Sequence, residues 1–273
     1  MPPNAATTAA ILKALSRHLR GEEHERAEIT INEARHEILA SELDLLVRDP
    51  ESPLVAARLI LTLRDITPSP KPPTELAAHI FTTTTSAAGA DPSSTSVILD
   101  DTHGGASQSQ SQPQPQTPPP PHRTSTIPTH PHPHPSLKQT YKTYLKTFMS
   151  PPTTALPALP AFLHQPTVTH NRRPLGIPAY HGLGQAVRAA VPDVDVEVEG
   201  LLADGARGLV AARLRFRGTL AAAAAPAGGG GGGRVDIGEI VFYWFEGGRI
   251  REVVSLVDFG GVSVVGGGGG GGS

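Results

Sequence analysis

Residues 67–136 have a composition that a hydrophobic core cannot use, and this limits what the rest of the chain can become. The segment contains a proline-rich stretch at 68–73, a Thr/Ser run at 82–86, alternating Ser and Gln at 107–114, and four prolines at 118–121. Such sequence favours extended, hydrated conformations over packed structure. We predict a disordered linker over residues 67–136 that separates two modules.

The overall composition further restricts the folded part. The 273 residues include 29 Gly and 28 Pro, with only 4% aromatic residues, so long stretches bury too little apolar surface to offset chain entropy. We expect little more than half of the chain to be ordered. The Ala/Gly run at 221–233 is predicted to be a flexible insertion, and the Gly-rich residues 266–273 a disordered tail.

Charge and cysteine content exclude several classes of function. The chain has no Cys, which rules out disulfides and thiolate chemistry, and its net charge of -2 gives no overall attraction to nucleic acid or anionic membranes. No apolar run approaches the roughly 20 residues that span a bilayer. We predict a soluble, intracellular, cytoplasmic protein without nucleic-acid or membrane partners. Because residues 1–20 carry three basic and no acidic residues, a mitochondrial transit peptide is the alternative interpretation of that segment.

Residues 1–66 show apolar positions at intervals of three and four residues. Ile31, Ala34 and Ile38 repeat in this way, and Leu45 and Leu46 continue the pattern before Pro50 and Pro53 interrupt it. This periodicity predicts a helical N-terminal region. A set of loosely packed helices and a helical surface for binding a partner remain the two interpretations.

Beyond residue 137 the apolar period changes from about 3.6 to 2. We predict helices over about 137–149, 154–163 and 183–191, and then strands at 194–199, at 209–217 and in a closing hairpin from Val235 to Asp258. Helices followed by antiparallel strands predict an α+β domain over residues 137–265. In the last strand, strict alternation would place Ile250, Glu252 and Asp258 on one largely apolar face.

The order of motifs in residues 137–265 resembles the SnoaL-like polyketide cyclase family, whose fold is a cone-shaped curved antiparallel sheet wrapped by helices, within the nuclear transport factor two-like fold. The matching pieces are Phe162-Leu-His, Thr169-His-Asn, Val191-Pro-Asp, the segment 203–213, Phe216-Arg-Gly-Thr, and Gly248-Arg-Ile-Arg-Glu running to Asp258. Each motif alone is weak, and the resemblance depends on their order and spacing.

The resemblance implies a pocket inside the cone for an apolar carbonyl compound. Asp258 matches the position of a family acid/base that catalyses cofactor-free aldol cyclisation or isomerisation, with Asn171 or His170 as donor to the carbonyl oxygen. The expected pocket-lining residues are Phe242, Trp244, Tyr180, Glu252 and Val254. No cofactor and no metal are expected, since the repeat His130-Pro-His-Pro-His lacks acidic or sulfur co-ligands nearby.

Two further expectations concern assembly and activity. The aromatic run Phe242 to Phe245 directs two rings to each side of its strand, and domains of the resembled fold often pair through the outer sheet face, so a homodimer through that face is predicted. The alternative to an enzyme is a catalytically inactive ligand-binding or protein-interaction module of the same fold, because fold alone does not determine function.

Overall fold

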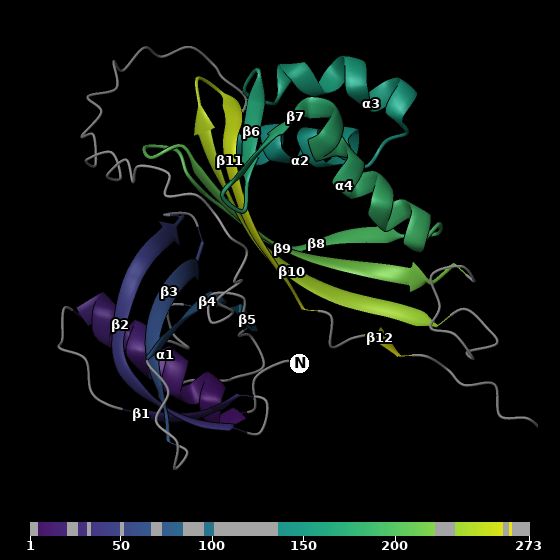
Figure 1. Ribbon diagram of the computed structural model, residues 1–273. Helices are drawn as coiled ribbons and strands as arrows, with labels where there is room; N and C mark the ends of the chain where they lie inside the picture. Colours follow the sequence, from purple (N-terminus) through teal and green to yellow (C-terminus); the bar gives the residue numbers. More distant parts are fainter. Residues whose placement is uncertain are drawn as a thin grey trace, which may run out of the picture.

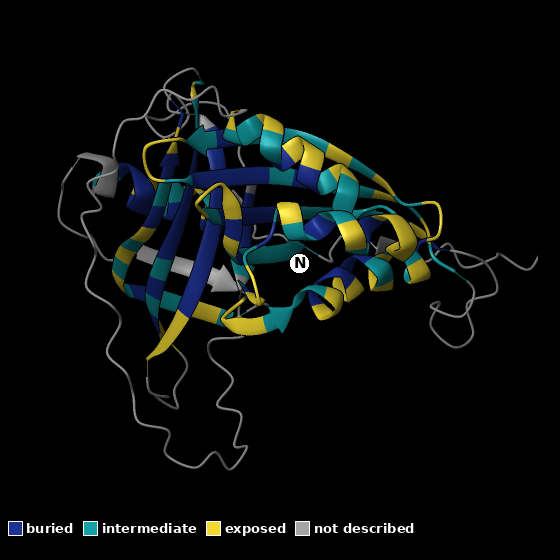
Figure 2. Cartoon of the chain, turned by 90° about the horizontal axis from the view of Figure 1, so that it is seen from above, coloured by how far each residue is buried: buried dark blue, intermediate teal, exposed yellow. Residues whose placement is uncertain are grey.

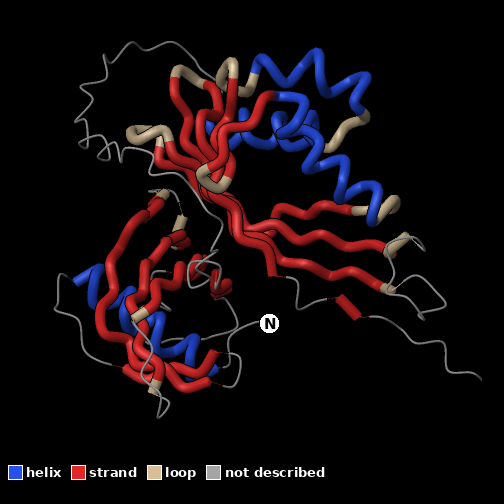
Figure 3. Tube along the Cα trace, viewed as in Figure 1, coloured by secondary structure: helices blue, strands red, loops and turns tan. Residues whose placement is uncertain are grey.

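The computed structural model describes residues 5–20, 27–31, 34–49, 52–66, 73–83, 96–100, 136–221, 233–258 and 262–263. These form two antiparallel-rich sheets with helices, which agrees with the predicted α+β class (Figures 1 and 3). Most of the expected linker and tail, including His130 to His134, and residues 222–232 of the expected insertion lie outside the described residues. Among the described residues, no helix is long and apolar enough to cross a bilayer.

The C-terminal domain builds a strongly curved sheet with α-helices on one side (Figure 1). The helices are α2 (Leu137–Phe148), α3 (Pro152–Ala158) and α4 (Ile177–Ala190), and a 3₁₀ turn covers Leu159–Ala161. The strands are β6 (Thr167–His170), β7 (Arg173–Gly176), β8 (Asp195–Asp204), β9 (Leu209–Thr219), β10 (Arg234–Glu246), β11 (Arg249–Asp258) and β12 (Val262–Ser263). Their order is β7-β6-β11-β10-β9-β8, and β12 pairs with β10.

Apolar periodicity explains why these helices form and which way they face. Tyr141 and Tyr144 of α2 are fully buried against the sheet, and Ser136 caps the helix by accepting a hydrogen bond from the Gln139 amide. α4 begins earlier than expected, at Ile177, because Pro178 suits the first turn of a helix. Figure 2 shows buried residues along the strands and along one side of the helices. The inner face of the curved sheet is therefore the core of this domain.

The N-terminal region is mainly strand, so the prediction of a helical region over residues 1–66 is wrong after Arg20. One helix, α1 (Ala5–Arg20), is followed by strands β1 (Ala27–Ile31), β2 (Ala34–Arg48), β3 (Leu54–Asp65), β4 (Thr74–Thr83) and β5 (Ser96–Asp100), paired in sequence order. The expected linker thus also contains two strands. The sheet is covered on both faces, which makes β3 a nearly continuous apolar run instead of an alternating one. Such a run cannot be distinguished from a buried helix by periodicity alone.

The two sheets pack face to face. A buried cluster joins residues of β2 to β5 with residues of β8 to β11 on the side of the C-terminal sheet opposite to its helices. Its buried members are Leu45, Val47, Ala56, Phe81 and Ile98 from the first sheet and Leu202, Leu209, Ala211, Ile240 and Phe242 from the second. Part of the outer sheet face, through which a homodimer was predicted, is therefore covered by the chain's own N-terminal sheet.

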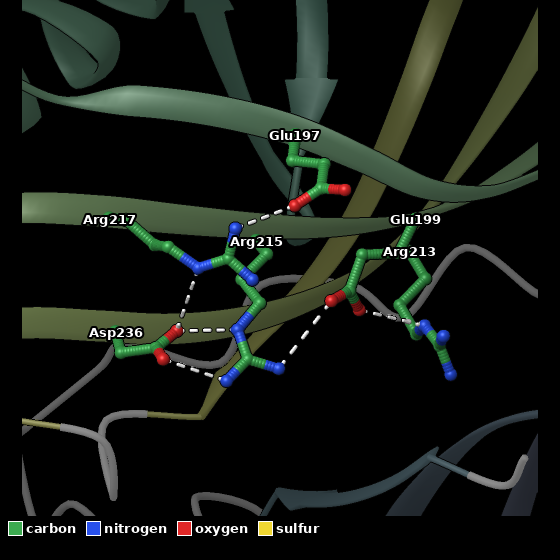
Figure 4. Close-up of polar contacts among 6 residues, drawn as sticks. All are labelled: Glu197, Glu199, Arg213, Arg215, Arg217 and Asp236. Carbon is green, nitrogen blue, oxygen red and sulfur yellow. Dashed lines mark hydrogen bonds and ion pairs between the residues drawn. The ribbon is translucent and has the colours of Figure 1, made fainter.

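Beyond this contact the outer face of the C-terminal sheet is charged (Figure 4). Arg215 forms a two-pronged ion pair with Asp236, with distances of 2.5 Å from Nε and 2.7 Å from Nη2 to the carboxylate oxygens. The guanidinium of Arg215 lowers the pKa of the Asp236 carboxyl. Four more residues join this pair in a network of ion pairs across the strands, namely Glu197, Glu199, Arg213 and Arg217. Interleaved charges of both signs suit the uncovered part of this face to contact with water and disfavour its association with other sheets.

Candidate active site

A cavity of about 250 Å³ lies between the inner face of the C-terminal sheet and helices α2 and α4. Most of its lining is apolar, with aliphatic side chains from α4 and from alternate positions of β9, β10 and β11. The polar groups are few. They are Tyr144, His170, Tyr180, Glu239, Tyr243 and Ser255. An apolar enclosure with a small number of convergent polar groups is the usual form of a small-molecule site.

Glu239 is the carboxylate of this cavity. It lies in the middle of β10, where Ile237, Val241 and Tyr243 share its side of the strand. Burial raises the pKa of Glu239 above its ordinary value of 4.5, and a hydrogen bond from Ser255 opposes this shift. A carboxyl group in such surroundings exchanges a proton nearer to neutral pH than an ordinary glutamate does.

Tyrosine hydroxyls supply the donors. The Tyr144 and Tyr180 hydroxyl oxygens lie 2.6 Å apart, and the Tyr243 ring centre lies 5.8 Å from that of Tyr144. Burial raises the pKa of all three phenols, so each stays protonated at neutral pH and can donate a hydrogen bond. The cavity therefore combines one titratable carboxyl with neutral donors.

The hydrogen bond between the two tyrosines gives a direct test of this arrangement. Tyr180→Phe should lower the free energy of unfolding by about 1–3 kcal/mol, because it leaves the buried Tyr144 hydroxyl without its partner. Denaturant unfolding of Tyr180→Phe, Tyr144→Phe and the double variant measures the coupling. Strictly additive losses would contradict the hydrogen bond.

Two of the predicted site residues, His170 and Tyr180, line this cavity. The His170 ring centre lies 5.8 Å from that of Tyr180, and burial lowers the pKa of the imidazole. His170 is therefore predominantly neutral at pH 7. One of its ring nitrogens can donate a hydrogen bond and the other can accept one.

Asp258 and the other residues predicted on β11 lie on the opposite face of the sheet. Trp244 pairs with Glu252 and Phe245 pairs with Ile250, which leaves Arg251 as an extra residue in β11. Past this bulge the alternation is inverted, so Val253, Ser255 and Val257 line the cavity, whereas Leu256 packs in the cluster between the two sheets. The lining of this cavity therefore excludes the predicted residues Asp258, Glu252, Val254, Phe242 and Trp244.

Asn171 acts on the backbone next to the cavity. Its side-chain amide donates to the Ser255 carbonyl oxygen at 3.1 Å, and its side-chain oxygen accepts from the Ser255 amide at 2.8 Å. A positive φ of 45° directs the side chain into this position, which asparagine tolerates better than most residues. Asn171 therefore fixes the strand that presents Ser255 to the cavity and does not itself line it.

The comparisons with known proteins concern this domain. The family model described as SnoaL-like polyketide cyclase matches residues 139–263. A SnoaL-like polyketide cyclase from Agrobacterium tumefaciens is 33% identical, and the match covers 46% of this chain and 93% of that one, with a TM-score of 0.39. Through this domain, the chain belongs to the SnoaL-like polyketide cyclase family.

Two further solved structures have lower sequence identity to this chain. A putative polyketide cyclase from Acidithiobacillus ferrooxidans is 21% identical, with 46% of this chain and 90% of that chain covered and a TM-score of 0.38. IdmH, a putative polyketide cyclase from Streptomyces antibioticus, is 19% identical, with 46% and 94% covered and a TM-score of 0.38. No match is found among curated proteins. The matches concern the C-terminal half of this chain only.

The carboxyl group that lines the cavity belongs to Glu239 on β10, whereas the sequence pattern pointed to Asp258 on β11. Glu239 shares its alternation with Val235, Ile237, Val241 and Tyr243, so a single acidic residue on an otherwise apolar side of β10 was a readable signal. Ser255 could not be found in the same way, since its side of β11 depends on the bulge at Arg251. Within the described part of the chain, no three His, Asp or Glu side chains gather as metal ligands would.

Proposed function

We propose that the cavity of the SnoaL-like domain binds a compact, apolar carbonyl compound and that Glu239 acts on it as a general acid and base. The observation that supports this proposal is a carboxyl group of raised pKa in an apolar cavity, beside protonated tyrosine hydroxyls. At about 250 Å³ the cavity is slightly smaller than the roughly 300–1,000 Å³ of common ligand sites, which favours a small ring-containing ligand.

The proposed chemistry requires one proton to move out and back. The Glu239 carboxylate removes a proton from the carbon next to the carbonyl group, and a tyrosine hydroxyl or His170 donates a hydrogen bond to the oxygen that becomes an enolate. In a cyclisation, the enolate carbon then forms a bond to a second carbonyl carbon of the same molecule, and protonated Glu239 returns its proton to the alkoxide. In an isomerisation, the proton returns to a different carbon.

Binding is tested with an aromatic ring ketone, 1-tetralone, by isothermal titration calorimetry of the full chain. Ser255→Phe should weaken binding at least about ten-fold, since a benzyl group there occupies the cavity that the ketone needs. The matched control is Val254→Phe, one residue away on the opposite face of β11, which should leave the affinity within a factor of about two. Equal binding by wild type and Ser255→Phe would place the ketone outside the cavity and contradict the proposal.

A further inference from the structure

A sequence repeat links the two halves of the chain. The segments 54–59 and 209–214 are both Leu-Val-Ala-Ala-Arg-Leu, and each follows a turn that begins five residues earlier at an aspartate, Asp49 in one and Asp204 in the other. Both segments open the second strand of a β-hairpin, namely β2–β3 and β8–β9. Six identical consecutive residues at the same point of the same structural element suggest a shared origin.

The strand pairing repeats residue by residue. In the first hairpin Val47 pairs with Ala56, and in the second Leu202 pairs with Ala211, each 155 positions later. The next two strands agree as well: Ala56 pairs with Phe81 as Ala211 pairs with Phe242. The last strands follow, since Ala77 pairs with Asp100 as Gly238 pairs with Asp258. The sheet β2–β5 therefore has the register of β8–β11 over the paired residues that the two sheets share.

An irregularity of the hairpin is also repeated. Both first strands carry a bulge at the same position, with Asp44 as the extra residue of β2 and Glu199 as the extra residue of β8. Both bulges present a carboxylate to the arginine of the repeated segment, at 2.7 Å for Asp44 and Arg58 and at 3.0 Å for Glu199 and Arg213. Since β-bulges are conserved within protein families, their coincidence is further support for a repeat.

We propose that β2–β5 are a degenerate second copy of β8–β11 that occupies the place of a second subunit, so that one chain forms a monomeric pseudo-dimer with a single functional cavity. When two copies of a sheet pack against each other about a two-fold axis, both copies contribute the same surface patch to the contact. The contact between the two sheets meets this requirement.

Equivalent positions form the contact on both sides. Val47 and Leu202, Ala56 and Ala211, and Phe81 and Phe242 are equivalent pairs, and all six residues are buried in the cluster between the sheets. The strands that meet across the contact are also equivalent: β2 meets β8, β4 meets β10 and β5 meets β11. Strand β2 also contacts β9, and the equivalent pair of strands, β8 and β3, is in contact as well. This is the pattern of a two-fold interface.

The inner faces of the two copies have diverged. The positions of Glu239 and Ser255 correspond by register to Ala78 and Val97, which are buried and apolar. In the N-terminal copy the fully buried Ile11 and Leu15 of α1 pack into the same cluster as Ala78 and Val97. Among the residues that the structure describes, the N-terminal inner face is therefore a packed core, whereas the C-terminal copy combines a cavity with a carboxyl group.

The contact is close enough to be tested at one residue. A β-carbon added to Gly200 would lie 2.6 Å from the Phe81 ring, a distance that real side chains do not tolerate. The same ring lies under the Arg213 guanidinium, at 5.8 Å from its centre, and Arg207 donates to the Leu46 carbonyl oxygen at 2.8 Å. A side chain at Gly200 must therefore displace the Phe81 ring from its place in the contact between the two sheets.

The experiment compares Gly200→Val with Gly238→Val in the full chain. Gly238 lies on β10 of the same sheet, and a β-carbon there would meet no atom within 4 Å. We expect the wild type to sediment as a monomer of 28.5 kDa at all protein concentrations tested. In Gly200→Val, amide hydrogen exchange in β3 and β4 should be at least about ten-fold faster than in the wild type, because overpacking weakens the cover of that sheet. Gly238→Val should exchange like the wild type.

Either of two results would overturn the proposal. If the wild type sediments as a stable dimer, the N-terminal copy does not stand in for a second subunit. If Gly200→Val exchanges no faster in β3 and β4 than Gly238→Val does, the two sheets do not make the contact that the proposal requires. Neither result depends on a ligand, so the test is independent of the function proposed for the cavity.

Discussion

Glu239→Gln should slow the base-catalysed ring opening of 5-nitrobenzisoxazole by about 10²–10⁴-fold, the contribution usual for a positioned general base. In this probe reaction a carboxylate removes the carbon-bound proton while the nitrogen–oxygen bond breaks, which yields a coloured cyanophenolate. A carboxylate is a much stronger base in an apolar cavity than in water, because burial disfavours its charged form. Glutamine keeps the shape of the side chain and removes the base.

The pH dependence of the same reaction identifies the group. A general base is active when it has lost its proton, so the rate should rise with pH through the pKa of Glu239 and then reach a plateau. Since burial raises that pKa, the midpoint should lie above the ordinary glutamate value of 4.5. A midpoint at or below 4.5 would mean that the active carboxylate is exposed to solvent.

The control for this prediction is Asp258→Asn. Asp258 was expected from the sequence to be the catalytic group, but it follows the bulge at Arg251 and lies on the side of β11 opposite to the cavity. Asp258→Asn should therefore retain the full rate. If Asp258→Asn loses activity and Glu239→Gln does not, the site described for this domain is incorrect. If the wild type binds ketones but shows no turnover that depends on Glu239, the domain is a binding module.

Phe242→Ala should lower the free energy of unfolding by about 3–5 kcal/mol, the usual loss for a fully buried phenylalanine. The Phe242 side chain is 1% exposed and lies between the two sheets, where its ring meets His79 edge-on with 5.2 Å between the ring centres. Its removal leaves a void that a closely packed contact cannot fill. The measurement is equilibrium unfolding in urea, followed by circular dichroism.

The matched control is Phe216→Ala on the neighbouring strand. Phe216 lines the cavity and is only partly buried, so its truncation mainly enlarges an existing space and should cost less. Equal losses in the two variants would show that Phe242 is not held between two packed layers. Such a result would also weaken the case for the N-terminal sheet as a built-in partner.

The C-terminal domain was largely predictable because its elements follow simple periods. The stripe of Tyr141 and Tyr144 predicted α2, and the alternation in β8 and in the second half of β9 predicted strands, since in these segments one side is more buried than the other. The site was less predictable. One extra residue at Arg251 inverts the face of every later position in β11, and nothing in local composition announces a bulge.

The prediction for the N-terminal half was wrong for a different physical reason. Strand β3 is buried by α1 on one side and by the second sheet on the other, so it lacks the alternation that would identify a strand. Strands β4 and β5 fall within a segment whose average composition suggests a linker, and they become regular by pairing, β4 with β3 and β5 with β4. The one signal that survives in the sequence is the repeat at 54–59 and 209–214, which is visible only when the two halves are compared.

Gly200 and its equivalent Leu45 show what joining two such sheets in one chain permits. In a symmetric homodimer every substitution occurs twice, so a residue that improves one side of the interface is also imposed on the other. Here Gly200 makes room for the Phe81 ring, while the bulkier Leu45 is itself buried in the cluster between the sheets. Each position is inherited and mutated separately. The chain can thus specialise one copy for support and the other for chemistry without compromise between them.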